Sequence, residues 1–137
     1  MVFNSSKNDK IIRMNITETH NNTNEIYENI WKCLDKGVND RFSDYHTFSL
    51  ATSPKNIVEV RTVVLRGYDR KNQSIIFHTN NLTNKISEIQ NNPSVGALFY
   101  DRKEKVQIRL NGDAVISNMD QYCKERWDKM SSQSQEC

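Results

Sequence analysis

The fold is decided by a run near the middle of the chain, Val58-Glu59-Val60-Arg61-Thr62-Val63-Val64-Leu65-Arg66. β-Branched residues dominate this run and favour an extended backbone. Because side chains alternate across a strand, one predicted face carries Glu59, Arg61, Val63 and Leu65, and the other carries Val58, Val60, Thr62, Val64 and Arg66. The run is therefore predicted to be a strand that brings two arginines into the fold.

Four further runs have strand patterning and are separated by turn residues. Two flank the central run, at Thr47–Thr52 and Ser74–Thr79, and two form a predicted hairpin, at 95–100 and 105–116. In the last run, the face opposite the predicted core carries Gln107, Arg109, Asn111 and Asp113. Five strands joined in sequence favour a mainly β protein with flanking helices, built as an antiparallel Greek-key or meander barrel.

Helical spacing of apolar residues predicts a helix at 24–37, a short helix at 83–91 and a last helix at 119–130. Residues 1–22 are polar without a sustained period, and are predicted to be a flexible N-terminal arm. The remaining residues, 23–137, are expected to form a single domain, since 137 residues leave room for one hydrophobic core.

Composition excludes several classes of protein. The net charge of +2, from 19 basic and 17 acidic residues, is too small to steer nucleic acid by itself. The three cysteines form no CxxC pair, so neither a disulfide framework nor a metal site is indicated. No apolar run approaches the roughly 18 residues of a membrane span, and no leader peptide is evident. A cytoplasmic protein is expected.

The start of the short helix is a candidate phosphate site. Its backbone N–H groups lack helical partners, and Thr83, Asn84 and Lys85 place a hydroxyl, an amide and an ammonium beside them. If the central run pairs with Ser74–Thr79, then Arg61 or Arg66 can reach the same place, and Thr79 can add a hydroxyl. The pattern alone favours a plainer interpretation, in which Arg61 pairs with Glu59 or Asp69, Lys85 is solvated and Thr83 only caps the helix.

Several separated motifs resemble one known family. They are Arg61-Thr62-Val63-Val64-Leu65-Arg66-Gly67-Tyr68-Asp69, Phe77-His78-Thr79-Asn80, Asn84-Lys85, Asn92-Pro93 and Gln107-Ile108-Arg109-Leu110-Asn111-Gly112. Together they resemble the pyridoxamine 5′-phosphate oxidase-like family of FMN-binding split barrels, over about residues 48–116 and more faintly over 127–134. Measured against that family, the chain is expected to be short at its C-terminus.

The resemblance implies an FMN-dependent oxidoreductase that acts on a small molecule as a homodimer, with FMN at the interface. It implies that Arg61 contacts the FMN phosphate and that Thr62, Val63, Val64 and Leu65 lay their backbone along the flavin ring. Arg66 would face the cofactor or a substrate phosphate, and Tyr122 and Arg126 would match a substrate-phosphate pair. The other implied cofactor contacts are His78 and Thr79 near the ribityl chain, Thr83, Asn84 and Lys85 in the phosphate loop, and Gln107 at the ring.

Two alternatives stay open. One is a flavin-binding protein without catalytic activity. The other is a β-barrel that binds single-stranded nucleic acid through Arg61, Arg66, Arg102, Lys103, Lys105 and Arg109. Such a groove needs exposed aromatic rings, whereas Phe48, Phe77 and Phe99 are predicted in the core, so nucleic acid is the less favoured partner. No catalytic side chain is identified, and a Tyr122–Arg126 contact on a helix surface is favoured over a substrate site as the explanation of that pair.

Overall fold

The computed structural model describes residues 10–19, 24–79 and 84–118. In chain order the elements are β1 (Lys10–Thr19), α1 (Asn24–Asn39), β2 (Thr47–Thr52), the 3-10 turn η1 (Pro54–Asn56), β3 (Glu59–Val64), β4 (Gly67–Asp69), β5 (Ser74–Thr79), α2 (Asn84–Asn91), β6 (Ser94–Asp101) and β7 (Val106–Asn118). The strands predicted at 95–100 and 105–116 are confirmed as β6 and β7, each slightly longer than expected.

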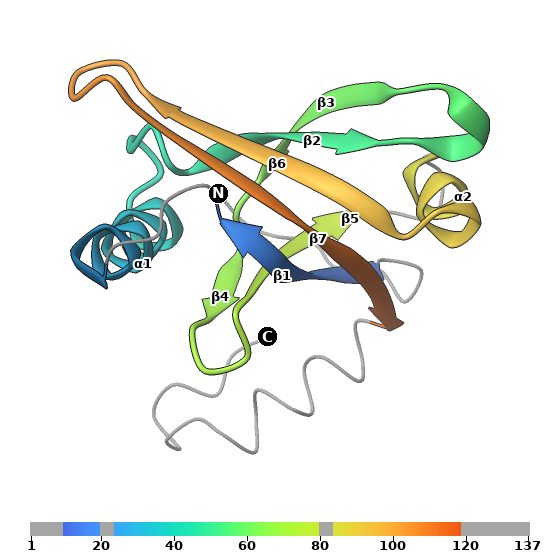
Figure 1. The fold of residues 1–137 in the computed structure, drawn as a ribbon, viewed down its shortest axis with the longest axis horizontal. Helices are drawn as coiled ribbons and strands as arrows, with labels where there is room; N and C mark the ends of the chain where they lie inside the picture. The colour runs from blue at the N-terminus through green and yellow to red at the C-terminus, as the bar shows by residue number, and fades with distance from the viewer. Residues whose placement is uncertain (1–9, 20–23, 80–83, 119–137) are drawn as a thin grey trace.

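The seven strands form a single antiparallel sheet in the order β3-β2-β6-β7-β1-β5-β4. β3 and β4 lie at opposite ends of this order, yet only Leu65 and Arg66 separate them in sequence. The sheet must therefore curl until its two edges approach each other, as Figure 1 shows. The predicted class, a mainly β split barrel with flanking helices, is confirmed.

The core lies inside this curl. Phe48, Phe77 and Phe99 are at most 2% exposed, and the Phe48 ring centroid lies 4.8 Å from that of Phe99 and 5.6 Å from that of Phe77. Helix α1 covers one end of the sheet, where Trp31 packs with its ring centroid 5.8 Å from that of Tyr68 on β4. Helix α2 lies at the other end (Figure 1). The predicted burial of the three phenylalanines is confirmed.

The prediction of a flexible arm is wrong for its described part. Residues Lys10–Thr19 form β1, which pairs with both β5 and β7 near the middle of the sheet. Ile12 and Met14 on this strand are fully buried. The apolar residues of β1 are few and lie among polar ones, so the alternation typical of a strand is weak. Both partner strands are also distant in sequence. Residues 1–9 and 20–22 of the predicted arm lie outside the described residues.

The predicted pairing of the central run with Ser74–Thr79 is also wrong. The run divides at Leu65 and Arg66: β3 pairs with β2, whereas the following Gly67–Asp69 forms β4 and pairs with β5. The division is fixed by two backbone hydrogen bonds, Leu65 N–H to the His46 carbonyl at 2.8 Å and Arg66 N–H to the Ile76 carbonyl at 2.9 Å. The chain thereby leaves one edge of the sheet and joins the other.

Candidate functional site

Arg61 is the centre of a polar cluster at the α2 end of the sheet. It follows the inward alternation of Val63 and Leu65, both of which are buried, and its own side chain stays 24% exposed. Its guanidinium forms an ion pair with Glu88 on α2, and its Nη1 donates to Thr52 Oγ1 at 2.8 Å. The Thr52 hydroxyl in turn donates to Glu88 Oε2 at 2.7 Å. Residues from β2, β3 and α2 thus form a closed triangle of contacts.

This geometry replaces the predicted surface pairing of Arg61 with Glu59 or Asp69. Asp69 instead bonds to Arg13 at 3.4 Å on the other side of the curl. Glu88 could not be predicted as the partner of Arg61 from sequence, because β3 and α2 come together only through the fold. One indirect sign existed: Thr52 is a polar residue in register with Phe48 and Leu50 on the core face of β2, and it is only 1% exposed.

The guanidinium keeps donors available beyond these contacts. One Nη2 hydrogen bonds to Glu88, and the Nη1 group bonds to Thr52 and, at 3.4 Å, to the Leu50 carbonyl. Arginine has five N–H donors in a planar fork. The Nε–H and one Nη2–H therefore have no partner within residues 10–19, 24–79 and 84–118. Two adjacent donors on a partly exposed cation suit a phosphate group.

Helix α2 brings the predicted phosphate loop to the same end of the molecule. The helix begins at Asn84, and Lys85 stands three positions before Glu88, the partner of Arg61. Positions three apart share a face of a helix. The backbone therefore places Lys85 and Arg61 at one end of the sheet and not on opposite sides of the barrel. Thr83 lies outside the described residues, and for Thr79, Asn84 and Lys85 only the backbone is described.

Strand β3 is an edge strand, because the order of the described sheet ends with it. Its outward face carries Val60, Thr62 and Val64, of which Val60 is 63% exposed. One side of its backbone pairs with β2, and no other described strand pairs with the opposite side. Edge backbone of this kind is open to another chain or to a flat ligand.

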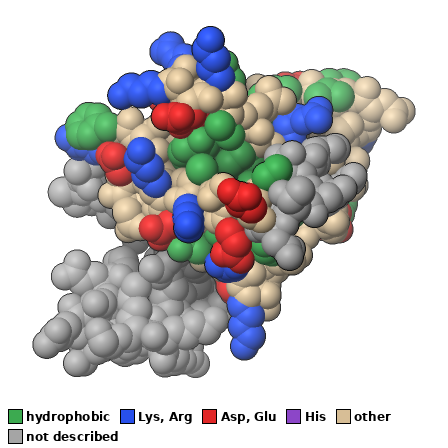
Figure 2. Space-filling model, turned by 60° about the vertical axis from the view of Figure 1, so that its left-hand side comes forward, with side chains coloured by type: hydrophobic (Ala, Val, Ile, Leu, Met, Phe, Trp, Pro, Cys, Tyr) green, Lys and Arg blue, Asp and Glu red, His purple; other side chains and the backbone are tan. Residues whose placement is uncertain are grey.

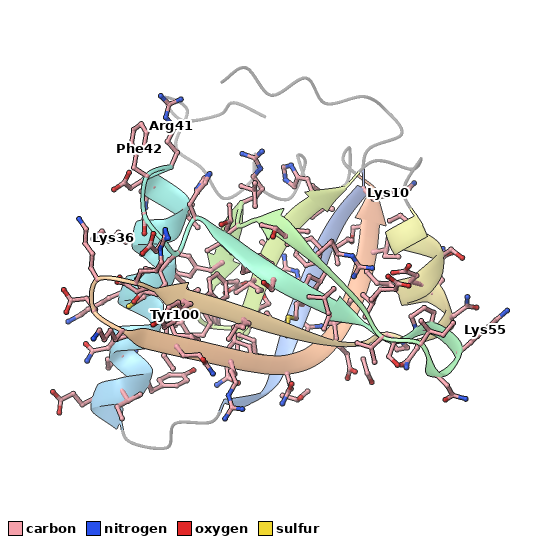
Figure 3. The ribbon with its side chains drawn as sticks, turned by 90° about the horizontal axis from the view of Figure 1, so that it is seen from above. Lys10, Lys36, Arg41, Phe42, Lys55 and Tyr100 are labelled. Carbon is pink, nitrogen blue, oxygen red and sulfur yellow. The ribbon has the colours of Figure 1, made fainter. Side chains whose placement is uncertain are left out.

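Gln107 lies away from Arg61 in the same chain. It pairs with Tyr100 across β6 and β7 and is exposed on the outer face of the sheet, whereas Arg61 lies on the inner face. Three strand spacings separate β7 from β3, which is roughly 14 Å. In Figure 3, Tyr100 lies toward the α1 end, while Lys55 marks the turn beside α2. One chain therefore does not bring Gln107 to the Arg61 cluster.

The remaining predicted residues have mixed placements. Arg66 is half-buried where the chain crosses between the sheet edges, up to roughly 17 Å along an extended backbone from Arg61. His78 is half-buried on β5, opposite Ile11 of β1. Tyr122 and Arg126, the predicted substrate pair, lie outside the described residues, as does the predicted helix 119–130.

Two cavities lie beside these elements. The larger, of about 640 Å³, lies between α1 and the β6–β7 hairpin and includes Ile26, Cys33, Tyr45 and Val106. Figure 2 shows the corresponding end of the molecule, where a hydrophobic patch is bordered by charged side chains. The other, of about 430 Å³, includes Thr52 of the Arg61 cluster together with Gly96 and Gly112. Of the predicted cofactor residues whose side chains the structure describes, none lines either cavity.

The curled antiparallel sheet, with an arginine on its edge strand held against a short helix, defines a split-barrel protein. Residues 28–118, which are 91 of 137, match the family described as pyridoxamine 5′-phosphate oxidase, FMN-binding domain. The chain belongs to this family, and the predicted resemblance is confirmed.

Curated relatives carry the same family name. The chain is 31% identical over 81 residues to a pyridoxine/pyridoxamine 5′-phosphate oxidase of Aliarcobacter butzleri, covering 58% of this chain and 37% of that protein. It is 35% identical over 85 residues to the enzyme of that name from Psychrobacter cryohalolentis, covering 61% and 38%. The chain therefore spans less than two fifths of the length of these relatives.

Solved structures share the fold. A pyridoxamine 5′-phosphate oxidase-related, FMN-binding protein of Nostoc punctiforme matches with a TM-score of 0.58 and 22% identity, over 76% of this chain and 57% of that one. PhzG of Burkholderia lata, solved with tetrahydrophenazine-1-carboxylic acid, matches with a TM-score of 0.60 and 20% identity, over 81% and 54%. In the described part of this chain, no helix has the length and hydropathy needed to cross a bilayer.

Proposed function

We propose that the chain binds FMN non-covalently as one half of a homodimeric flavoprotein that oxidises or reduces a small molecule. The observation that carries this proposal is Arg61, which lies against α2 with two guanidinium N–H donors still available. A phosphate monoester matches that donor fork and the positive N-terminal end of a helix. Family membership supplies the identity of the phosphorylated ligand.

The proposed cofactor contacts follow the chain from β3 to α2. The phosphate would be held by Arg61, Lys85, Asn84, Thr83 and Thr79. Glu88 already neutralises part of the positive charge of Arg61, so Lys85 and the helix N-terminus would supply the remaining positive charge. The backbone of residues 62–65 would lie along the flavin ring, which the edge position of β3 allows. His78 and Arg66 would contact the ribityl chain or a substrate. When bound, FMN would supply the redox chemistry.

A second copy of the chain would complete the site. Gln107 cannot reach the flavin held by Arg61 of its own chain, because it lies on the outer face of the sheet and toward the other end. The same outer face exposes Val60 by 63%, Leu98 by 38% and Tyr100 by 49%. Apolar exposure gathered on one face of a sheet is typical of a protein interface. A dimer through this face would cover it and deliver Gln107 of the partner.

The substrate is proposed to be a small phosphorylated amine or alcohol, because the curated relatives are named pyridoxine/pyridoxamine 5′-phosphate oxidases. Arg66, Tyr122 and Arg126 are the proposed substrate contacts. The alternative is a flavin-binding protein without turnover. Anaerobic addition of pyridoxamine 5′-phosphate to the FMN-loaded chain separates the two, since an oxidase loses its visible flavin absorbance and a simple flavin carrier keeps it. A cytoplasmic location remains a prediction.

The nucleic-acid alternative is disfavoured by the fold. Arg61 faces inward and is paired with Glu88, at the opposite end of the sheet from Arg102, Lys103 and Lys105 in the β6–β7 turn. The three phenylalanines that could have stacked on bases are buried. The basic residues therefore do not form one continuous groove with aromatic rings.

The proposed site is tested by FMN titration of Arg61→Ala, with Lys71→Ala as the matched control. Loss of a charged hydrogen-bonding partner should weaken FMN binding by about 10- to 100-fold. Lys71 is an exposed cation in the β4–β5 turn, and its removal should leave the affinity unchanged. Circular dichroism checks that each variant is folded. If folded Arg61→Ala bound FMN with the same affinity as wild type, the proposed contact between Arg61 and the FMN phosphate would be wrong.

A further inference from the structure

We infer that Glu88 is a positioning residue for the cofactor phosphate and acts through Arg61. The inference rests on the proposed function of Arg61 in binding FMN. Glu88 accepts from the Arg61 guanidinium and from the Thr52 hydroxyl, the latter at 2.7 Å. Its side chain is only 15% exposed, and Thr52 is 1% exposed. The Glu88 carboxylate is thus part of a partly buried hydrogen-bonded cluster and not one half of a solvent-exposed ion pair.

The triangle fixes where the guanidinium can point. Arginine is long and loses rotamer freedom whenever a ligand orders it. Here Thr52 and Glu88 order it before the ligand arrives, since they engage Nη1 and Nη2 from two different elements. The Nε–H and the second Nη2–H keep no partner in the described chain. A fork held in place with these donors open is preorganised for phosphate.

Glu88 also links the two parts of the proposed phosphate site. Arg61 comes from β3, whereas Lys85 comes from α2, one helical turn before Glu88. The ion pair therefore sets the distance between the sheet edge and the helix that carries the phosphate loop. A carboxylate beside a dianionic ligand is unfavourable by itself. Its expected net effect is favourable because it orders the Arg61 guanidinium before the phosphate binds.

The test compares FMN with riboflavin, which lacks the phosphate. Glu88→Ala should weaken FMN binding by about tenfold and leave riboflavin binding unchanged, because one ordered charged contact is lost. Glu88→Gln should stay within about threefold of wild type, since its amide oxygen can still accept from Arg61 and Thr52. In the Arg61→Ala background, Glu88→Ala should cause no further loss, since coupled residues are not additive.

Three results would overturn the inference. Equal weakening of FMN and riboflavin by Glu88→Ala would show a purely structural role. Tighter FMN binding by Glu88→Ala would show that the carboxylate competes with the phosphate. An additive loss in the double variant would show that Glu88 acts without Arg61. If Arg61→Ala alone leaves FMN affinity unchanged, the proposed function fails first, and this outcome is distinct from the other three.

Discussion

The guanidinium of Arg61 on β3 is ion-paired with the carboxylate of Glu88 on α2. Through Thr52, this pair joins three elements that are far apart in sequence, and it holds the short helix against the edge of the sheet. Arg61 therefore stabilises the fold and is also the centre of the proposed cofactor site.

Thr52→Val should lower the free energy of unfolding by about 1–3 kcal/mol. The hydroxyl of Thr52 is buried and bonds both Arg61 and Glu88, so an isosteric methyl group leaves two polar groups with one partner fewer. Thr47→Val, at an exposed position of the same strand, should change it by less than about 0.5 kcal/mol. Urea denaturation measures both, and equal effects would contradict a structural role for the triangle.

Gly112→Ala should destabilise the sheet strongly, by about 3 kcal/mol or more. A Cβ at this position would lie 2.1 Å from the Asn15 carbonyl oxygen of β1. Gly96→Ala is the control, because its nearest atom would be at an ordinary 3.6 Å, on the Asn111 side chain. The midpoint of urea denaturation distinguishes them. A tolerated Gly112→Ala would mean that β1 does not pair with β7 at this position as described.

Met14→Ala tests whether β1 belongs to the core. Met14 is fully buried, so its truncation should cost about 2–5 kcal/mol of stability. Thr17→Ala, at an exposed position of the same strand, should cost less than about 1 kcal/mol. Truncation in a flexible arm would have almost no effect on stability. An unchanged unfolding midpoint for Met14→Ala would therefore support the flexible arm predicted from the sequence and contradict a core position for β1.

Leu98→Arg should convert the proposed dimer to a monomer. Leu98 lies on the exposed face of β6, between Ser49 of β2 and Arg109 of β7. The new cation would lie beside Arg109 and would be buried without a partner in a dimer. Phe42→Ser, at an 82% exposed side chain after α1, is the control. Light scattering after size exclusion gives the mass, and an unchanged dimer in Leu98→Arg would place the interface elsewhere.

Tyr45→Phe should flatten the alkaline loss of stability. Burial, together with hydrogen bonds to Cys33 and Asp101, raises the pKa of Tyr45 above its usual range. A tyrosine with a raised pKa in the folded state stabilises that state below the unfolded pKa of about 10, and the contribution falls as the pH rises further. Urea denaturation from about pH 8 to 11 measures the slope. An unchanged slope in Tyr45→Phe would contradict this role of the buried tyrosine.

Local alternation was sufficient to predict most of the sheet. β2 and β5 have the predicted bounds, and β6 and β7 differ by a few residues, because short turns and period-two patterns are properties of adjacent residues. The core face of β7, with Ile108, Leu110 and Ala114 buried, follows from the same pattern. The short helix spans Asn84–Asn91, and its predicted first residue, Thr83, lies outside the described residues.

Long-range pairing could not be predicted in the same way. The uniform run from Val58 to Arg66 does not reveal that its last residues cross to the other sheet edge, because that crossing depends on His46 and Ile76. Ile12 and Met14 look like isolated apolar residues until β5 and β7 flank them. The role of Glu88 likewise depends on its contacts with Arg61 and Thr52, which come from other elements of the fold. Each miss concerns a partner that is distant in sequence.

The central claim is that this chain recognises the phosphate of a flavin, and the most direct measurement is the affinity of the wild-type chain for FMN relative to riboflavin. Two charged hydrogen-bonded contacts to the phosphate predict that FMN binds about 100-fold more tightly or more. Titrations followed by flavin fluorescence give both dissociation constants. Equal affinity for the two ligands, or binding of neither, would contradict the account.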